Sequence, residues 1–385
     1  MPGKVNTRIV KRTKKLSAAV LSLLLLLLLI FVPQPALAGA RSGLMICGNT
    51  IIPSLFPFLA LSSFIIGSGA ADSCGRLIEP LTKSIFRLPG SAGTALLLGA
   101  VGGYPVGADA VSKLCENGSL SKREGERLLC FAINSSPAFI IGAVGAGFFS
   151  NTQTGILLYA VHLLASFSIG LVMRAGLHKK PEQNTPKIHI ISRTDRGNLS
   201  TAFVRAVTGS AESIVTICAF VVLFSALNSL LNYTGASQLL ALTFSKILQP
   251  PAVDPQFYNR AAAGILEVTN GCAAASGSVG MPAVLLSAAM LGFSGVSVQF
   301  QVISLIKSSG MSANLFIATR FLHMLLSVLF AYVLFSVFPS AMPPSRAVSA
   351  FALNPNGIAV TFHSVPAVCA MLFIIAILLL SLVKI

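Results

Sequence analysis

The chain has 385 residues, of which 54% are hydrophobic and 10% are charged, and its mean hydropathy is +0.83. That leaves too few polar residues to cover a soluble globule of this size, so the composition predicts a polytopic membrane protein with the lipid bilayer as its surroundings. The net charge of +16 would suggest a nucleic-acid partner in a soluble protein. Here, basic residues gather at 4–15 and 174–205, beside apolar spans, which is typical of cytoplasmic segments. No nucleic-acid partner is expected.

The N-terminal segment is open to two interpretations. A basic run is followed by an apolar stretch at 16–32 and then by Pro35-Ala-Leu-Ala38, which resembles a signal-peptidase site. The stretch is longer than a usual signal core of about 7 to 15 residues, so an uncleaved anchor is favoured over a removed signal. The seven cysteines show no CxxC spacing, and neither a metal nor another cofactor is expected.

The hydropathy pattern predicts an all-α fold in five parts. Taken in chain order, the expected membrane elements are spans at 16–33 and 51–70, a broken segment at 91–110, spans at 129–150, 154–173 and 212–231, a second broken segment at 261–281, and spans at 283–305, 314–338 and 360–383. The corresponding parts are the basic N-terminus and anchor or signal segment 1–38, the first repeat 39–180, the basic cytoplasmic loop 181–211, the second repeat 212–340 and the C-terminal transmembrane helix 341–385.

The two broken segments carry residues that membrane helices usually avoid. The first contains Gly103, Tyr104 and Pro105, and the second contains Glu267. Basic residues flank the first segment on both sides, so it is expected to enter and leave by one face as a re-entrant hairpin, with the second entering from the other face. Paired broken segments in corresponding halves point to the substrate site of a transporter.

A short internal repeat supports two related halves. His162 to Ser166 and His323 to Ser327 share a His-apolar-Leu-apolar-Ser pattern at a separation of 161 residues. An odd number of crossings between equivalent elements would invert the second copy, as in many secondary transporters. For each of the two histidines, a packed neutral ring is favoured over a proton relay.

Residues 134–136 form a candidate substrate-binding group. Ser136 before Pro137 predicts a helix start inside the membrane, which would direct free N–H groups of the next turn at an anion. Asn134 and Ser135 would add polar groups beside it. A proline kink whose freed carbonyls bind serine hydroxyls is the structural alternative. A weaker helix start is expected at 278–282.

The second group consists of Glu267, Thr269 and Asn270. An acidic side chain at membrane depth is costly, and it is therefore expected to line a cavity, bind a coupled proton or pair with a cation. A structural ion pair with Arg260 or Arg320 is the alternative to a substrate-binding role.

Ser294 is expected to contribute a hydroxyl to the same site. The rival interpretation is an intramembrane serine protease with a dyad of Ser294 and His323. Such runs of small residues occur often in membrane helices, so an enzyme is not expected.

The ordered set of motifs at 53–58, 79–80, 103–108, 124–131 and 134–145 resembles the sporulation integral membrane protein family typified by YlbJ. The resemblance covers most of the chain and implies a nucleoside-recognition or Gate domain, related to segments of nucleoside and ferrous-iron transporters. It further implies a bacterial cell membrane or outer forespore membrane location, and a role in endospore formation, with dipicolinate as the transported anion. A nucleoside or other small-metabolite carrier and a non-transporting scaffold are the alternatives. Coupling to a proton or cation and assembly into a homo-oligomer stay open.

Overall fold

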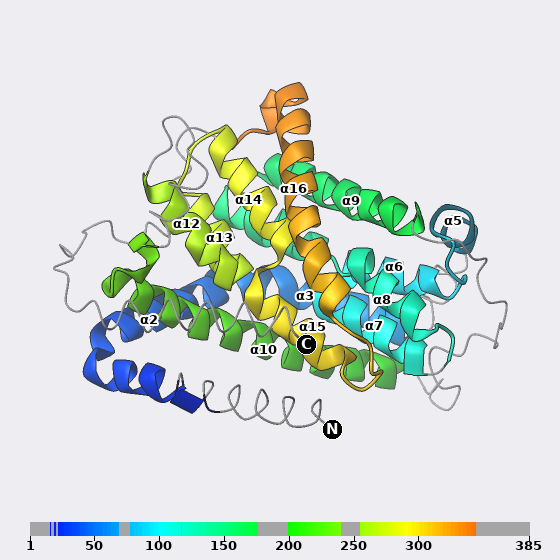
Figure 1. The fold of residues 1–385 in the computed structure, drawn as a ribbon, viewed down its shortest axis with the longest axis horizontal. Helices are drawn as coiled ribbons and strands as arrows, with labels where there is room; N and C mark the ends of the chain where they lie inside the picture. The colour runs from blue at the N-terminus through cyan, green and yellow to red at the C-terminus, as the bar shows by residue number, and fades with distance from the viewer. Residues whose placement is uncertain are drawn as a thin grey trace, which may run out of the picture.

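The computed structural model describes residues 22–68, 78–116, 118–175, 199–239 and 255–343, with Leu16, Ala19 and Val20 besides. Every regular element in these ranges is helical, as the hydropathy pattern predicts (Figure 1). The expected C-terminal helix at 360–383 lies outside the described residues, as do 1–15, 69–77, 176–198 and 240–254.

The first long helix starts well before the expected Ile51. It comprises α2 (Pro33–Ile46), the wide turns of η1 (Cys47–Ile51) and α3 (Ile52–Gly67), so the predicted part boundary at 38/39 falls inside α2. Small residues allow this additional part of the helix to pack closely on α10: a Cβ atom on Gly39 would lie 2.7 Å from the Cβ atom of Ser229. Such glycines let membrane helices approach closely.

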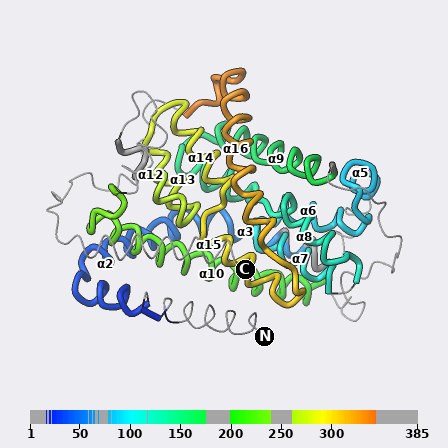
Figure 2. The backbone as a smooth tube through the Cα atoms, in the orientation of Figure 1, coloured from blue at the N-terminus to red at the C-terminus, as the bar shows by residue number. Residues whose placement is uncertain are grey.

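Helix α10 (Leu199–Tyr233) runs beside α2 and α3 (Figures 1 and 2). It begins inside the segment expected to be a basic loop, at 181–211. Its first turns have a partner, because the ring of Phe203 meets that of Phe64 of α3 edge to face, with centroids 5.5 Å apart. Tertiary packing therefore extends the helix beyond its hydropathy signal.

The other described elements form two series in the same order. The first follows the short α5 (Glu79–Leu81) and η2 (Thr82–Phe86), and comprises α6 (Ala92–Gly102), α7 (Tyr104–Glu116), α8 (Lys122–Ala132), η3 (Ala138–Phe148) and α9 (Thr152–Ala175). The second comprises α12 (Pro255–Leu266), α13 (Val268–Ala275), α14 (Met281–Phe293), α15 (Gly295–Ile306) and α16 (Asn314–Val337), and is followed by the single turn η5 (Pro339–Ala341).

Within the described ranges, five helical stretches are long and apolar enough to cross a membrane. They are Pro33–Leu61, Thr152–Arg174, Leu199–Tyr233, Met281–Ile306 and Asn314–Val337. The predicted spans 154–173, 283–305 and 314–338 correspond closely to three of these. The predicted span 129–150 is instead divided between α8 and η3.

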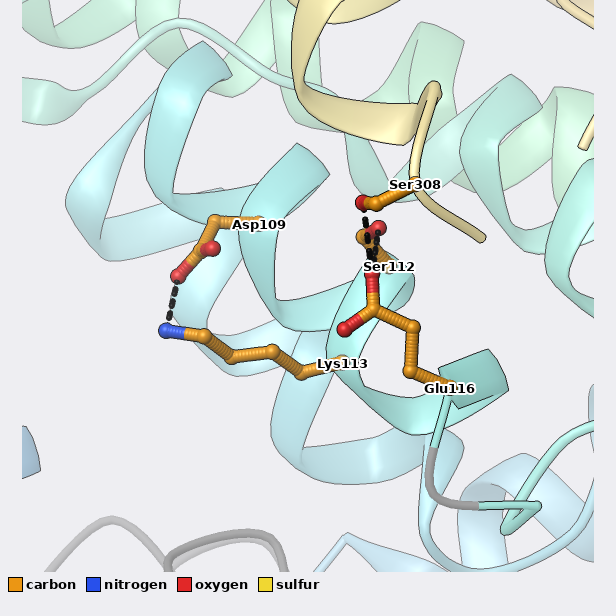
Figure 3. A network of polar contacts seen from close by, with 5 residues as sticks. All are labelled: Asp109, Ser112, Lys113, Glu116 and Ser308. Atoms are coloured by element: carbon orange, nitrogen blue, oxygen red, sulfur yellow. Dashed lines mark hydrogen bonds and ion pairs between the residues drawn. The ribbon is translucent and has the colours of Figure 1, made fainter. Parts of the chain in front are cut away.

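A polar network joins the two series at the end of α7 (Figure 3). The Glu116 Oε1 atom accepts hydrogen bonds from Ser112 Oγ at 3.1 Å and from Ser308 Oγ, just beyond α15, at 2.6 Å. The hydroxyl of Ser308 and then that of Ser112 lower the pKa of Glu116. On the same helix, Lys113 forms an ion pair with Asp109 at 2.7 Å.

Candidate functional site: a cavity between two hairpin tips

The first hairpin turns at Gly103. This residue has φ 89° and ψ −174°, a conformation open essentially to glycine alone, and it joins α6 directly to α7. A side chain on Gly99 would overlap the Ala132 carbonyl oxygen, which shows how tightly the hairpin packs against α8. A Cβ on Gly103 itself would lie 3.2 Å from the Ser136 Cβ atom. The tip of the first hairpin therefore rests on the interruption between α8 and η3.

The predicted helix start at Ser136 is confirmed. Helix α8 ends at Ala132, and η3 begins after an interruption whose first residue, Ile133, is extended. The Ser136 Oγ atom accepts a hydrogen bond from the Phe139 N–H at 3.2 Å, which is the contact of an N-cap residue. Ser135 N–H donates to the Nε2 atom of His162 at 3.1 Å. Residues 133–136 are not helical, so the break is wider than a proline kink, although one freed carbonyl, that of Phe131, does accept a hydrogen bond from a serine hydroxyl, Ser166 Oγ.

The second hairpin turns at Glu267. This residue is extended between α12 and α13, and its Oε2 atom accepts a hydrogen bond from the Asn270 N–H at 2.8 Å. Asn270 Oδ1 in turn accepts from Ser225 Oγ of α10 at 2.8 Å. The ion pairs among the described residues are Lys83–Glu79 and Lys113–Asp109. The alternative of a structural ion pair between Glu267 and Arg260 or Arg320 is therefore wrong.

The second tip also rests on an interrupted helix. Ser294 separates α14 from α15, and both Ser294 and the first residue of α15, Gly295, have positive φ, of 72° and 74°. A Cβ on Gly295 would lie 2.9 Å from the backbone nitrogen of Val268, so the glycine allows the Glu267 turn to approach. Helix α14 starts as predicted near Pro282, although Gly280 precedes it and its cap carries no side-chain hydrogen bond.

An open cavity lies where the two tips meet, with about 670 Å³ of empty space including its mouth. The predicted site residues that line it are Gly103, Tyr104, Pro105, Ser135, Ser136, Glu267 and Thr269. Asn134, Asn270 and Ser294 are buried behind this lining, and Asn134 Nδ2 donates to the Phe131 carbonyl at 3.0 Å. The Tyr104 hydroxyl crosses to the second series and donates to the Leu291 carbonyl at 3.0 Å.

Two further polar residues line the cavity and were not predicted from the sequence. Ser213 lies on α10, where Ser213, Ile217 and Phe220 follow helical spacing on the face toward the cavity. Gln301 lies on α15. Its neighbour Gln299, which interrupts the same apolar span, instead donates to the Phe293 carbonyl at 3.2 Å.

The serine protease dyad, the rival interpretation of the sequence, has no supporting geometry in the described structure. The Nε2 atom of His323 lies 3.2 Å from the carbonyl oxygen of His162, and the Ser294 hydroxyl is fully buried. A nucleophile and its base need a hydrogen bond between them, and the described residues contain none between Ser294 and His323.

Sequence comparison decides the family. The chain is 30% identical over 349 residues to the sporulation integral membrane protein YlbJ of Bacillus subtilis (strain 168), covering 86% of this chain and 83% of that protein. The chain belongs to the YlbJ family. A family model described as Gate, nucleoside recognition, matches residues 50–152, which include the first hairpin and the α8 interruption.

The fold of this YlbJ family member is also similar to a solved structure, that of CNTnw in an inward-facing substrate-bound state. The match has a TM-score of 0.51 at 15% sequence identity and covers 84% of this chain and 86% of the other. The identity is low, so the likeness concerns the fold. Together with the apolar helices, these comparisons establish an integral membrane protein whose fold is similar to that of CNTnw.

Proposed function

We propose that this protein carries a small anionic metabolite across the membrane, and that the cavity between the hairpin tips is its substrate site. The observation that carries the proposal is the composition of the cavity wall. Both turns, at Gly103 and Glu267, and the fresh helix start at Ser136 line one cavity. Interrupted helices provide backbone N–H and C=O groups at membrane depth, and those that protein side chains leave unpaired can bind a polar ligand or water.

We further propose that the two series of helices are inverted repeats and that both hairpins are re-entrant. In each series a hairpin without a linking loop is followed by an interrupted helix and then by a long helix that carries the His-apolar-Leu-apolar-Ser pattern. In each, the hairpin tip rests on the interruption. Inverted repeats with the substrate held between them are a common construction in secondary transporters.

The first half of the site, formed by the tip of the first hairpin and the helix start at Ser136, suggests that the substrate is an anion. The helix start at Ser136 combines N–H groups with the positive end of a helix dipole, equivalent to roughly half a charge. Dipicolinate, a planar dianion, is the substrate that the family resemblance suggests, and movement across the outer forespore membrane during endospore formation is the corresponding role. Glu267 would then bind a coupled proton or face the pyridine nitrogen of the substrate.

A nucleoside is the second candidate substrate. It is favoured by the nucleoside-recognition description of the model that matches residues 50–152. The groups on the second half of the wall, Glu267 and Gln301, are suited to hydroxyl and amide partners.

A thermal-shift screen of the purified protein separates these candidates. Dipicolinate, related dicarboxylates and nucleosides are tested at equal concentrations, because a ligand that binds the native state raises the melting temperature. A selective rise with dipicolinate supports the anion carrier, and a selective rise with nucleosides supports the second candidate. No rise with any compound contradicts the proposed site and supports a scaffold.

A further inference from the structure

Arg320 of α16 is fully buried, and it is the largest of the fully buried side chains in the described structure. Its Nη1 atom donates to the Ile133 carbonyl at 3.1 Å, and its Nη2 atom donates to the Cys130 carbonyl. The guanidinium carbon lies 4.8 Å from the centre of the Phe316 ring. The charged group of the second series thus binds the carbonyl end of α8, directly behind the first half of the site.

The remaining carbonyl groups at this end of α8 also face protein atoms. The Phe131 carbonyl accepts hydrogen bonds from Ser166 Oγ at 2.5 Å and from Asn134 Nδ2. The Ala132 carbonyl packs against Gly99 of the first hairpin. Arg320 therefore occupies the part of the interruption where a helix presents its negative dipole end.

The positive charge of Arg320 has no carboxylate within ion-pair distance among the described residues. Carbonyl oxygens, the helix dipole and the Phe316 ring together solvate it. Carbonyls at broken helices are the groups with which many carriers bind a coupling cation. Here the side chain of Arg320 supplies the positive charge in place of such a cation.

We propose that Arg320 is a tethered cation that replaces a bound metal cation at the α8 interruption and makes the first half of the site positive for an anionic substrate. This proposal rests on the proposed transport function and adds the origin of the positive charge at the substrate site. It requires substrate uptake that is independent of Na⁺, and it makes Arg320 a positioning and specificity-determining residue.

Among the described residues, the donors to the carbonyls at the interruption of the second series are neutral side chains. Gln299, a neutral amide, donates to the Phe293 carbonyl there. At the position of α9 that the 161-residue repeat relates to Arg320 stands Tyr159, whose hydroxyl donates to the Ala100 carbonyl at 3.0 Å. The cation is thus confined to the half of the site that contains Ser135 and Ser136, and the two halves differ in charge.

The test uses the full chain, purified and reconstituted in vesicles. Uptake of dipicolinate and the melting temperature are measured in NaCl, in KCl and in N-methylglucamine chloride. Both are expected to be the same in all three salts for the wild type. A loss of uptake on removal of Na⁺, or a rise in melting temperature caused by Na⁺ alone, would overturn the proposal.

The second part of the test uses the variant Arg320→Ala. It is expected to melt lower and to lose about tenfold or more of the uptake, as for removal of a charged hydrogen-bond partner. Millimolar guanidinium is expected to restore part of both. Arg127→Ala is the matched control, because Arg127 of α8 also donates to a carbonyl, that of Phe86, at 3.1 Å. Equal effects of guanidinium on both variants would contradict the proposal.

The two parts of this experiment test the transport function and the role of Arg320 separately. If the wild type takes up no dipicolinate, the proposed function fails, while the melting temperatures in the three salts still test the tethered cation. If Arg320→Ala does not fold, the salt dependence of the wild type decides.

Discussion

His162 and His323 stack on each other, with ring centroids 4.5 Å apart and an angle of 27° between the rings. They occupy equivalent positions in the repeated pattern on α9 and α16, 161 residues apart. Equivalent residues touch each other only near an axis that relates the two halves. In the proposed inverted repeat, this pair marks that axis.

The contact between His162 and Ser135 predicts how the first half of the site is held. His162→Ala would leave the buried Ser135 N–H without its acceptor, at a cost of about 1–3 kcal/mol. His162→Gln offers an amide oxygen to the same N–H and should lose less stability. The free energy of unfolding of both variants in detergent measures the difference. Equal losses would show that ring packing alone matters.

Gly103→Ala should lower both stability and uptake, because it introduces backbone strain and also displaces the tip of the first hairpin from Ser136. The backbone conformation of Gly103, with φ 89° and ψ −174°, costs an alanine about 1–3 kcal/mol. The new methyl group would also press on Ser136. Gly280→Ala is the matched control, since Gly280 has φ 65° and ψ −142° with open space around its Cβ position. Both variants should lose stability, but only Gly103→Ala should also lose uptake. Equal uptake in the two would argue against the tip contact.

Glu267 has two separable roles in this account. Glu267→Ala should lose about 0.5–2 kcal/mol of stability with the cap on α13 and should abolish uptake. Glu267→Gln keeps an oxygen for the Asn270 N–H but loses the charge and the capacity to bind a proton. It should therefore retain stability and still lose uptake. Wild-type uptake by Glu267→Gln would reduce the residue to a helix cap.

The Glu116 network predicts a dependence on acid (Figure 3). The Ser308 hydroxyl is the largest cause of the lowered pKa of Glu116, whose ordinary value is 4.5. A carboxyl with a lowered pKa stabilises the fold above its unfolded-state pKa, and this contribution is lost as the pH falls through the lowered value. Ser308→Ala should thus reduce the melting temperature at neutral pH, and the difference should vanish in acid. Ser336→Ala, on an exposed part of α16, should show no such trend.

The local features of the site could be predicted from the sequence. Ser136 before Pro137 indicated a helix start, and the Ser136–Phe139 hydrogen bond confirms it. Gly103 and Glu267 indicated interruptions, and both are the turns of hairpins. These features depend on backbone conformation and capping within a few residues, which sequence reasoning addresses directly.

Contacts between distant helices could not be predicted in the same way. Arg320 was expected to pair, if at all, with Glu267, but it binds the Cys130 and Ile133 carbonyls. A backbone acceptor leaves no signal in the residue types of α8. Ser213 of α10 faces the cavity only because α10 packs against α2 and α3, and a single serine in an apolar helix carries no such information.

Uptake of dipicolinate by vesicles that contain the wild type, Ser136→Ala or Ser168→Ala tests the substrate site most directly. Ser136 lines the cavity, whereas Ser168 is an outward-facing serine of α9 that donates to the Leu164 carbonyl. We expect equal uptake by the wild type and Ser168→Ala, and a loss of about tenfold or more in Ser136→Ala with its fold retained. Wild-type uptake by Ser136→Ala would contradict the proposed substrate site.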